Sequence, residues 1–134
     1  MMIDALIEAA KEGNWKEVDE GILKVRNNKL AVDWAFRKGL NDGNGNVRDL
    51  AASILEKTSS SLTGEMKKKL YSHMKTDNNP YVNFRSAFAI AAHDSSFHKE
   101  EVKDVLEKAK KDPDVSQFAE FYLKQSLLKA PKKE

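Results

Sequence analysis

Apolar residues recur along the chain at the spacing of one helix face. In segment 3–11, Ala10 lies about one turn after Leu6 and Ile7, the pattern of an amphipathic helix. Glycine, asparagine, aspartate and proline interrupt the pattern at short intervals and favour turns. The chain is therefore predicted to be all-α, with eight helices near residues 3–11, 15–25, 29–40, 46–57, 64–75, 81–93, 99–110 and 115–128.

These predicted helices form pairs that repeat. At a shift of 35 residues Asp42 falls on Asp77 and Asp77 on Asp112; the last helix aligns at a shift of 33, and the first pair loosely at 29. One helical hairpin cannot bury its own apolar face, so neighbouring hairpins must stack. We expect one domain over residues 1–130 followed by a frayed tail at 131–134. Its fold would be a right-handed α-α superhelix, a short α-solenoid, of about four hairpins near residues 3–26, 28–57, 62–93 and 97–128.

Two kinds of residue recur at fixed places in the repeat. An aspartate, Asp42, Asp77 or Asp112, precedes each of the last three second helices. Its carboxylate can accept hydrogen bonds from turn amides and favours the positive end of a helix. The small residues Ala51 and Ala52 follow in the second repeat and are predicted to let two helices approach closely.

The second repeat has Asp42, then Val47 and Arg48, then Ala51 and Ala52, and lastly Leu55. This order resembles the short HEAT repeat of bacterial and archaeal proteins, and the resemblance covers most of the chain as four hairpins. The third and fourth repeats depart from it, because Asn83 and Ser116 follow the valine where the family has arginine. The resemblance implies a non-enzymatic α-solenoid that binds another protein along its second helices.

Composition narrows the class of protein. Apolar residues make up 40% and charged residues 33% of the 134 residues, as in a folded domain. The net charge of +2 argues against an obligatory polyanionic partner. There is no cysteine, which excludes disulfides and thiolate metal sites. The beginning of the chain resembles neither a signal peptide nor a membrane span, so we expect a cytoplasmic protein.

Residues with catalytic or metal-binding chemistry are few. His73, His93 and His98 do not have the spacing of metal ligands on one helix, and His93 is interpreted as a structural residue. We therefore expect no enzyme activity, cofactor or metal. Lysines 67–69 and 108, 110 and 111 form two basic clusters; we interpret them as solvated helix faces, with a nucleic-acid patch as the alternative.

The second helices acquire a second apolar face toward the C-terminus. At about 100° per residue, Phe84 and Phe88 lie roughly opposite Val82, and Phe121 lies away from the core side of the last helix. Such a face either packs between adjacent repeats or forms an exposed groove or dimer surface. The predicted partner-binding residues are Phe84, Arg85, Phe88, Phe121 and Lys124.

Three functions remain open. The leading hypothesis is a scaffold module that binds another protein on the face of its second helices. The second is nucleic-acid binding, as in the HEAT-like alkylpurine DNA glycosylases, which are longer and strongly basic. The third is a self-associating unit whose C-terminal apolar edge pairs across a two-fold axis.

Overall fold

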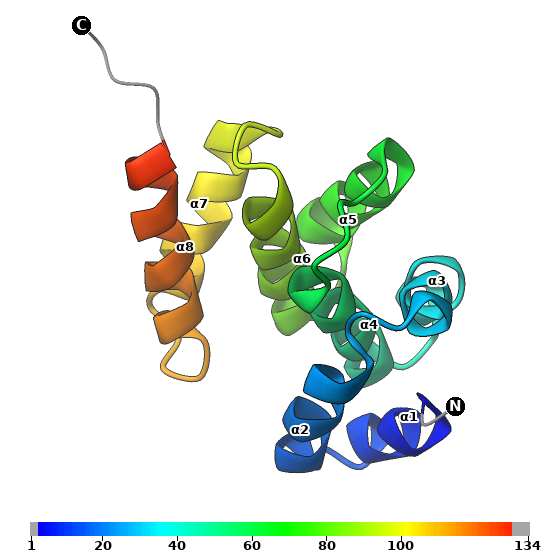
Figure 1. The fold of residues 1–134 in the computed structure, drawn as a ribbon. Coiled ribbons are helices and arrows are strands. Elements are labelled where there is room, and N and C mark those ends of the chain that lie inside the picture. The colour runs from blue at the N-terminus through cyan, green and yellow to red at the C-terminus, as the bar shows by residue number, and fades with distance from the viewer. Residues whose placement is uncertain (1–2, 130–134) are drawn as a thin grey trace, which may run out of the picture.

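The computed structural model describes residues 3–129, and every regular element in that range is helical (Figure 1). The all-α prediction is confirmed. The predicted helix ends agree with the structure to within one residue, apart from the end of the third helix. The elements are α1 (Ile3–Lys11), α2 (Trp15–Val25), α3 (Lys29–Arg37), the 3-10 turn η1 (Gly39–Asn41), α4 (Gly45–Lys57), α5 (Gly64–Thr76), α6 (Pro80–His93), α7 (Lys99–Ala109) and α8 (Ser116–Lys129).

Asparagine side chains cap the first turns of four helices, α2, α3, α4 and α6. The Asn28 side-chain oxygen accepts a hydrogen bond from Leu30 N at 2.9 Å, and Asn44 and Asn79 do the same for Asn46 N and Tyr81 N. Each bond satisfies a backbone amide that has no partner inside the helix. Pro80 takes the first position of α6, where a missing N–H costs nothing. Local sequence therefore fixes where these helices begin.

The three repeated aspartates occupy equivalent turns. A side-chain oxygen of Asp42, Asp77 or Asp112 accepts a hydrogen bond from the amide two residues later, at 2.8, 2.9 and 2.9 Å respectively. The prediction that these carboxylates bind turn amides is confirmed. The sequence repeat is thus also a repeat of local structure.

The third helix ends earlier than predicted, at Arg37. Gly39 in the following 3-10 turn lies directly against α4, and a Cβ atom at this glycine would come within 2.6 Å of Ala51 Cβ. Only two small residues allow the backbones to approach this closely. The chain therefore leaves the α-helical path here in order to pack on α4.

Each first helix packs against the second helix of its own hairpin, and the second helices α2, α4, α6 and α8 contact one another in succession. Figure 1 shows α1 and α2 at one end of the molecule and α8 at the other. Helix α4 contacts α1, α2, α3 and α6, and α6 contacts α4, α5, α7 and α8. These two central helices supply much of the buried core, including Leu50, Ile54, Leu55, Ala87 and Ile90.

A half-buried ion pair joins the second hairpin to the third. Arg48 donates from Nε and Nη2 to the two Asp77 oxygens, at 2.9 and 3.0 Å, and from Nη1 to Asp42 O at 2.9 Å. Burial raises the pKa of Asp77, but hydrogen bonds from Arg48, the Asn79 amide and His73 outweigh it and hold that pKa below its usual value. The arginine of the second repeat therefore links two successive turns.

Candidate partner-binding surface

The five residues predicted to bind a partner lie in three different environments. Phe84 is half-buried against the core, Arg85 is mostly covered, and Phe88 is fully buried. Phe121 and Lys124 are exposed on α8. The structure therefore leaves two of the five residues on an open surface, packs Phe84 partly against the core, and covers Arg85 and Phe88.

Phe88 does not lie on an accessible surface, so that part of the prediction is wrong. Its side chain is 0% exposed because α8 packs over it. The Phe88 ring centroid lies 5.6 Å from that of Tyr122, in a stacked arrangement, and 6.0 Å from that of Phe118. The second apolar face of α6 is thus a contact between adjacent repeats, one of the two interpretations that the sequence allowed.

Arg85 does not form the polar rim of an exposed patch either. Its Nε donates to Asp49 Oδ1 at 3.1 Å, and its Nη1 lies 3.5 Å from Glu56 Oε1. Both carboxylates come from α4, and both residues are buried. The guanidinium also lies 5.3 Å from the centroid of the Phe118 ring. Arg85 therefore joins α4 to α6 from inside the molecule.

Glu56 extends this buried cluster to α8. Tyr122 donates its hydroxyl hydrogen bond to Glu56 Oε2, with an oxygen–oxygen distance of 2.5 Å, and Lys57 Nζ lies 3.3 Å from the same oxygen. Among the described residues Glu56 Oε1 has no hydrogen-bond partner, and the nearby Arg85 supplies only its charge. One carboxylate thus connects three successive second helices.

Burial and charge act against each other in this cluster. Burial raises the pKa of Asp49, and the nearby Arg85 only partly opposes that rise. Burial lowers the pKa of Arg85, but the two carboxylates outweigh it, so the net shift is upward. Burial, reinforced by Glu56, also raises the pKa of Tyr122, which therefore remains a hydrogen-bond donor. Burial therefore opposes the charge of Asp49, and the contact with Arg85 favours it.

Sequence reasoning missed this cluster. Asp49 and Glu56 are seven residues apart, so they lie on one face of α4 two turns apart, where the equivalent α6 residues are Phe84 and Ala91. That contrast shows the face to be polar in one repeat and apolar in the next. It does not show that an arginine of the next helix covers it, because this depends on how the helices pack.

The open face of α8 is the counterpart of a buried face of α6. At the shift of 33 residues that aligns these helices, Phe88 corresponds to Phe121, and Phe84 and Ala91 correspond to Gln117 and Lys124. On α6 this face is covered by α8, and Phe88 is 0% exposed; on α8 Phe121 is 54% exposed. No described helix follows α8, so this contact surface is left open.

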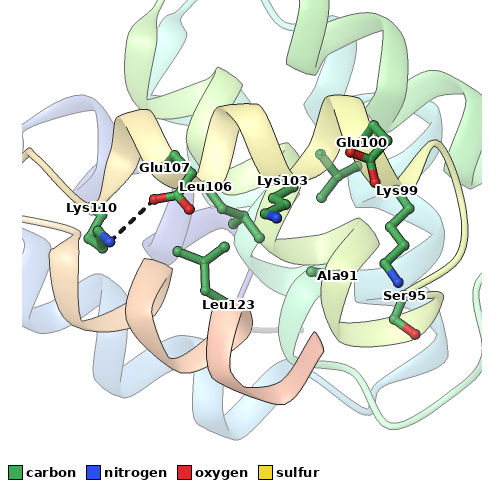
Figure 2. A pocket seen from close by; sticks show the side chains of 10 residues that line it. Ala91, Ser95, Lys99, Glu100, Lys103, Leu106, Glu107, Lys110 and Leu123 are labelled. Carbon is green, nitrogen blue, oxygen red and sulfur yellow. Dashed lines mark ion pairs between the residues drawn. The ribbon is translucent and has the colours of Figure 1, made fainter. Parts of the chain in front are cut away.

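A groove lies on the other side of α8. It has a volume of about 400 Å³ between α7, α8 and the end of α6 (Figure 2). Leu106, Val102 and Leu123 form its apolar floor, and Lys99 and Lys103 stand on its rim. Leu123 follows Phe121 by two residues, which is about 160° around the helix. The groove and the Phe121 face are therefore separate surfaces.

The lysines of the basic clusters are partly engaged within the molecule. Lys67 Nζ pairs with Asp94 at 2.9 Å, and Lys69 Nζ donates to the carbonyl oxygen of Phe36 at 2.8 Å. Lys110 pairs with Glu107 at 3.2 Å, as Figure 2 shows. These contacts leave fewer ammonium groups to bind phosphates, which weighs against a nucleic-acid patch.

His93 has a structural contact. Its Nε2 donates to the carbonyl oxygen of Leu55 at 2.9 Å, and burial lowers the pKa of its ring.

Over the described residues, no group of three or more histidine, aspartate or glutamate side chains is arranged to hold a metal ion. Over residues 3–129, no helix combines the length and the apolar character that crossing a membrane requires.

In comparisons with known proteins, no protein-family model, curated protein or solved structure matches this chain.

Proposed function

We propose that this chain is a short, right-handed, HEAT-like α-solenoid. We further propose that it is a non-enzymatic module that binds a helix of a partner protein on the outer face of α8. Support for the repeat architecture comes from the equivalent aspartate turns and from the succession of contacts through α2, α4, α6 and α8. Support for binding comes from the surface that this succession leaves uncovered.

The observation that carries the proposal is the difference between Phe88 and Phe121. Both occupy the same position of the repeat, yet one is 0% and the other 54% exposed. In α6 a following helix contributes Phe118 and Tyr122 to cover the phenylalanine. A helix from a binding partner would cover Phe121 in the same manner, by placing apolar side chains on its ring.

The polar residues around Phe121 suit a binding surface. Gln117, Glu120 and Lys124 are all exposed and surround the ring with one amide, one acid and one base. An apolar centre with a polar rim is the usual arrangement of a protein interface. Phe118 adds a second aromatic ring that is 37% exposed.

Site-specific photo-crosslinking tests the proposal. Phe121 would be replaced by the photoreactive amino acid benzoylphenylalanine in the native host, and exposed Glu65 on α5 would be replaced in a control strain. We expect a covalent protein adduct at position 121 and none at position 65. Adding Lys124→Glu to the position-121 variant should reduce the adduct, whereas Lys68→Glu on α5 should leave it unchanged.

Two results would contradict the proposal. The first is the absence of any adduct at position 121 when the photoreactive protein accumulates to the level of the control. The second is an adduct that forms equally at both positions, because the contact would then not depend on α8.

A further inference from the structure

The charges on the open face of α8 are arranged so that the face complements itself. Glu120 and Lys124 are exposed, four residues apart, and lie on either side of Phe121 along the helix. When two copies of this helix face lie antiparallel, the acid of each copy faces the base of the other. Each acid then lies beside a base, and the two apolar centres meet.

From this pattern we infer that two copies of the chain pair through α8, antiparallel, across a two-fold axis that passes near Phe121. The inference rests on the proposed function, because it names the protein that covers the open face. In this arrangement Phe121 of each copy packs on α8 of the other. Glu120 of each copy lies beside Lys124 of the second copy, so the contact contains two such ion pairs.

The direction of pairing follows from the same charges. In a parallel arrangement Glu120 would lie beside Glu120 and Lys124 beside Lys124, and like charges in contact oppose association. A closed two-fold contact uses the same surface on both copies, which is what a self-complementary helix face provides. The net charge of +2 per chain adds little repulsion between the copies.

The contact between α6 and α8 indicates how such pairing would bury the ring. There, two aromatic rings of one neighbouring helix pack against Phe88, so one helix can place apolar side chains on a phenylalanine at this position. A contact through one helix from each copy is smaller than the roughly 1,600 Å² of a standard interface. The dimer should therefore be weak and should dissociate on dilution.

Sedimentation equilibrium of the purified full chain, measured from about 5 to about 500 µM, tests the inference. We expect a monomer–dimer equilibrium for the wild type. Glu120→Lys and Lys124→Glu should each weaken the dimer, by about tenfold or more in dissociation constant, because each places like charges together. Phe121→Ser should weaken it at least as much, and Glu65→Lys, the same charge change on α5, should leave it unchanged.

Mixing the two charge variants gives the sharpest measurement. Glu120→Lys offers two lysines and Lys124→Glu offers two glutamates, so an antiparallel heterodimer of the two regains both ion pairs. An equimolar mixture should therefore associate with a dissociation constant close to that of the wild type, although neither variant dimerises well alone. This recovery also shows that both variants are folded.

Three results would overturn the inference. One is a chain that stays monomeric up to the highest concentration. Another is a mixture that associates no better than its components. The third is growth beyond a dimer, which would indicate head-to-tail contact with the exposed Trp15, Leu23 and Leu30 of α2 and α3. If the purified chain is monomeric but position 121 crosslinks to a different protein in the host, the inference fails and the proposed function stands.

Discussion

Arg85 lies between buried carboxylates and not at the rim of an open surface. An arginine between two buried carboxylates contributes through charge pairing that largely offsets the cost of taking all three groups out of water. The stability of such a cluster depends on its completeness, because removing one member leaves the others buried without compensation. Asp49 and Glu56 therefore make Arg85 a structural residue in this chain.

Replacing Arg85 with methionine tests this at the scale of one residue. Arg85→Met keeps an unbranched apolar side chain but leaves the buried Asp49 without an ion-pair partner and Glu56 with only Tyr122 and Lys57, so we expect the free energy of unfolding to fall by about 3 to 5 kcal/mol. Arg37→Met is the matched control. It removes an exposed pair with Asp33, so it should cost less than about 1 kcal/mol. Urea denaturation of the three proteins at pH 7 measures both effects, and equal losses would contradict the buried role.

The pH dependence of the same variant has a defined sign. Burial already raises the pKa of Asp49 in the folded chain, and loss of Arg85 should raise it further. A carboxyl group whose pKa is higher in the folded than in the unfolded chain favours folding at low pH, and this contribution is lost as pH rises through the folded pKa. The stability difference between wild type and Arg85→Met should therefore shrink between pH 7 and pH 4. A difference that grows on acidification would contradict this account.

At the scale of elements, α6 and α8 occupy the same position in the sequence repeat but have different neighbouring helices. Each carries a phenylalanine at the same position of the repeat, and α6 lies between two second helices while α8 has one on a single side. Figure 1 shows α8 at the edge of the molecule. The number of neighbouring helices, not the residue type, decides which phenylalanine contributes to stability.

The pair Phe88→Ala and Phe121→Ala measures this difference. We expect Phe88→Ala to lower the free energy of unfolding by about 3 to 5 kcal/mol, because it empties a packed site between α6 and α8. Phe121→Ala should change it by no more than about 0.5 kcal/mol, since its ring is exposed in the monomer. Chemical denaturation at a concentration too low for dimerisation provides the comparison. Similar losses in both variants would mean that the monomer also covers Phe121.

At the scale of the whole molecule, the helices with the most neighbours should form the most stable region. Helices α4 and α6 are each packed against four other helices, whereas α8 contacts α6 and α7. Local opening costs most where a segment has neighbours on all sides and least at the ends of an array.

Hydrogen exchange checks this order. Backbone amides in α4 and α6 should exchange most slowly, and those in α1 and α8 faster, when exchange is followed by mass spectrometry at neutral pH. If protection were uniform from α1 to α8, the chain would open only as one cooperative unit, and the peripheral helices would be as stable as the central ones.

Much of the local structure follows from residues close together in the chain. Asn28, Asn44 and Asn79 cap the helices that follow them, and Asp42, Asp77 and Asp112 bind amides two residues away. Such contacts depend on neighbours within one turn, so the amino-acid order alone predicts the helices and turns. The end of α3 was missed, because it depends on the approach of Gly39 to Ala51 on another helix.

The sequence by itself determined the helical class, the positions of the turns and the repeat, since these depend on side-chain periodicity and short-range hydrogen bonds. Only the tertiary structure decided which of two equivalent phenylalanines is covered, and that Arg85 pairs with a carboxylate 36 residues earlier in the chain. Burial and charge pairing depend on which helix lies next to which. Phe88 and Phe121 occupy corresponding faces of α6 and α8, but α8 has no successor among the described elements to cover its face.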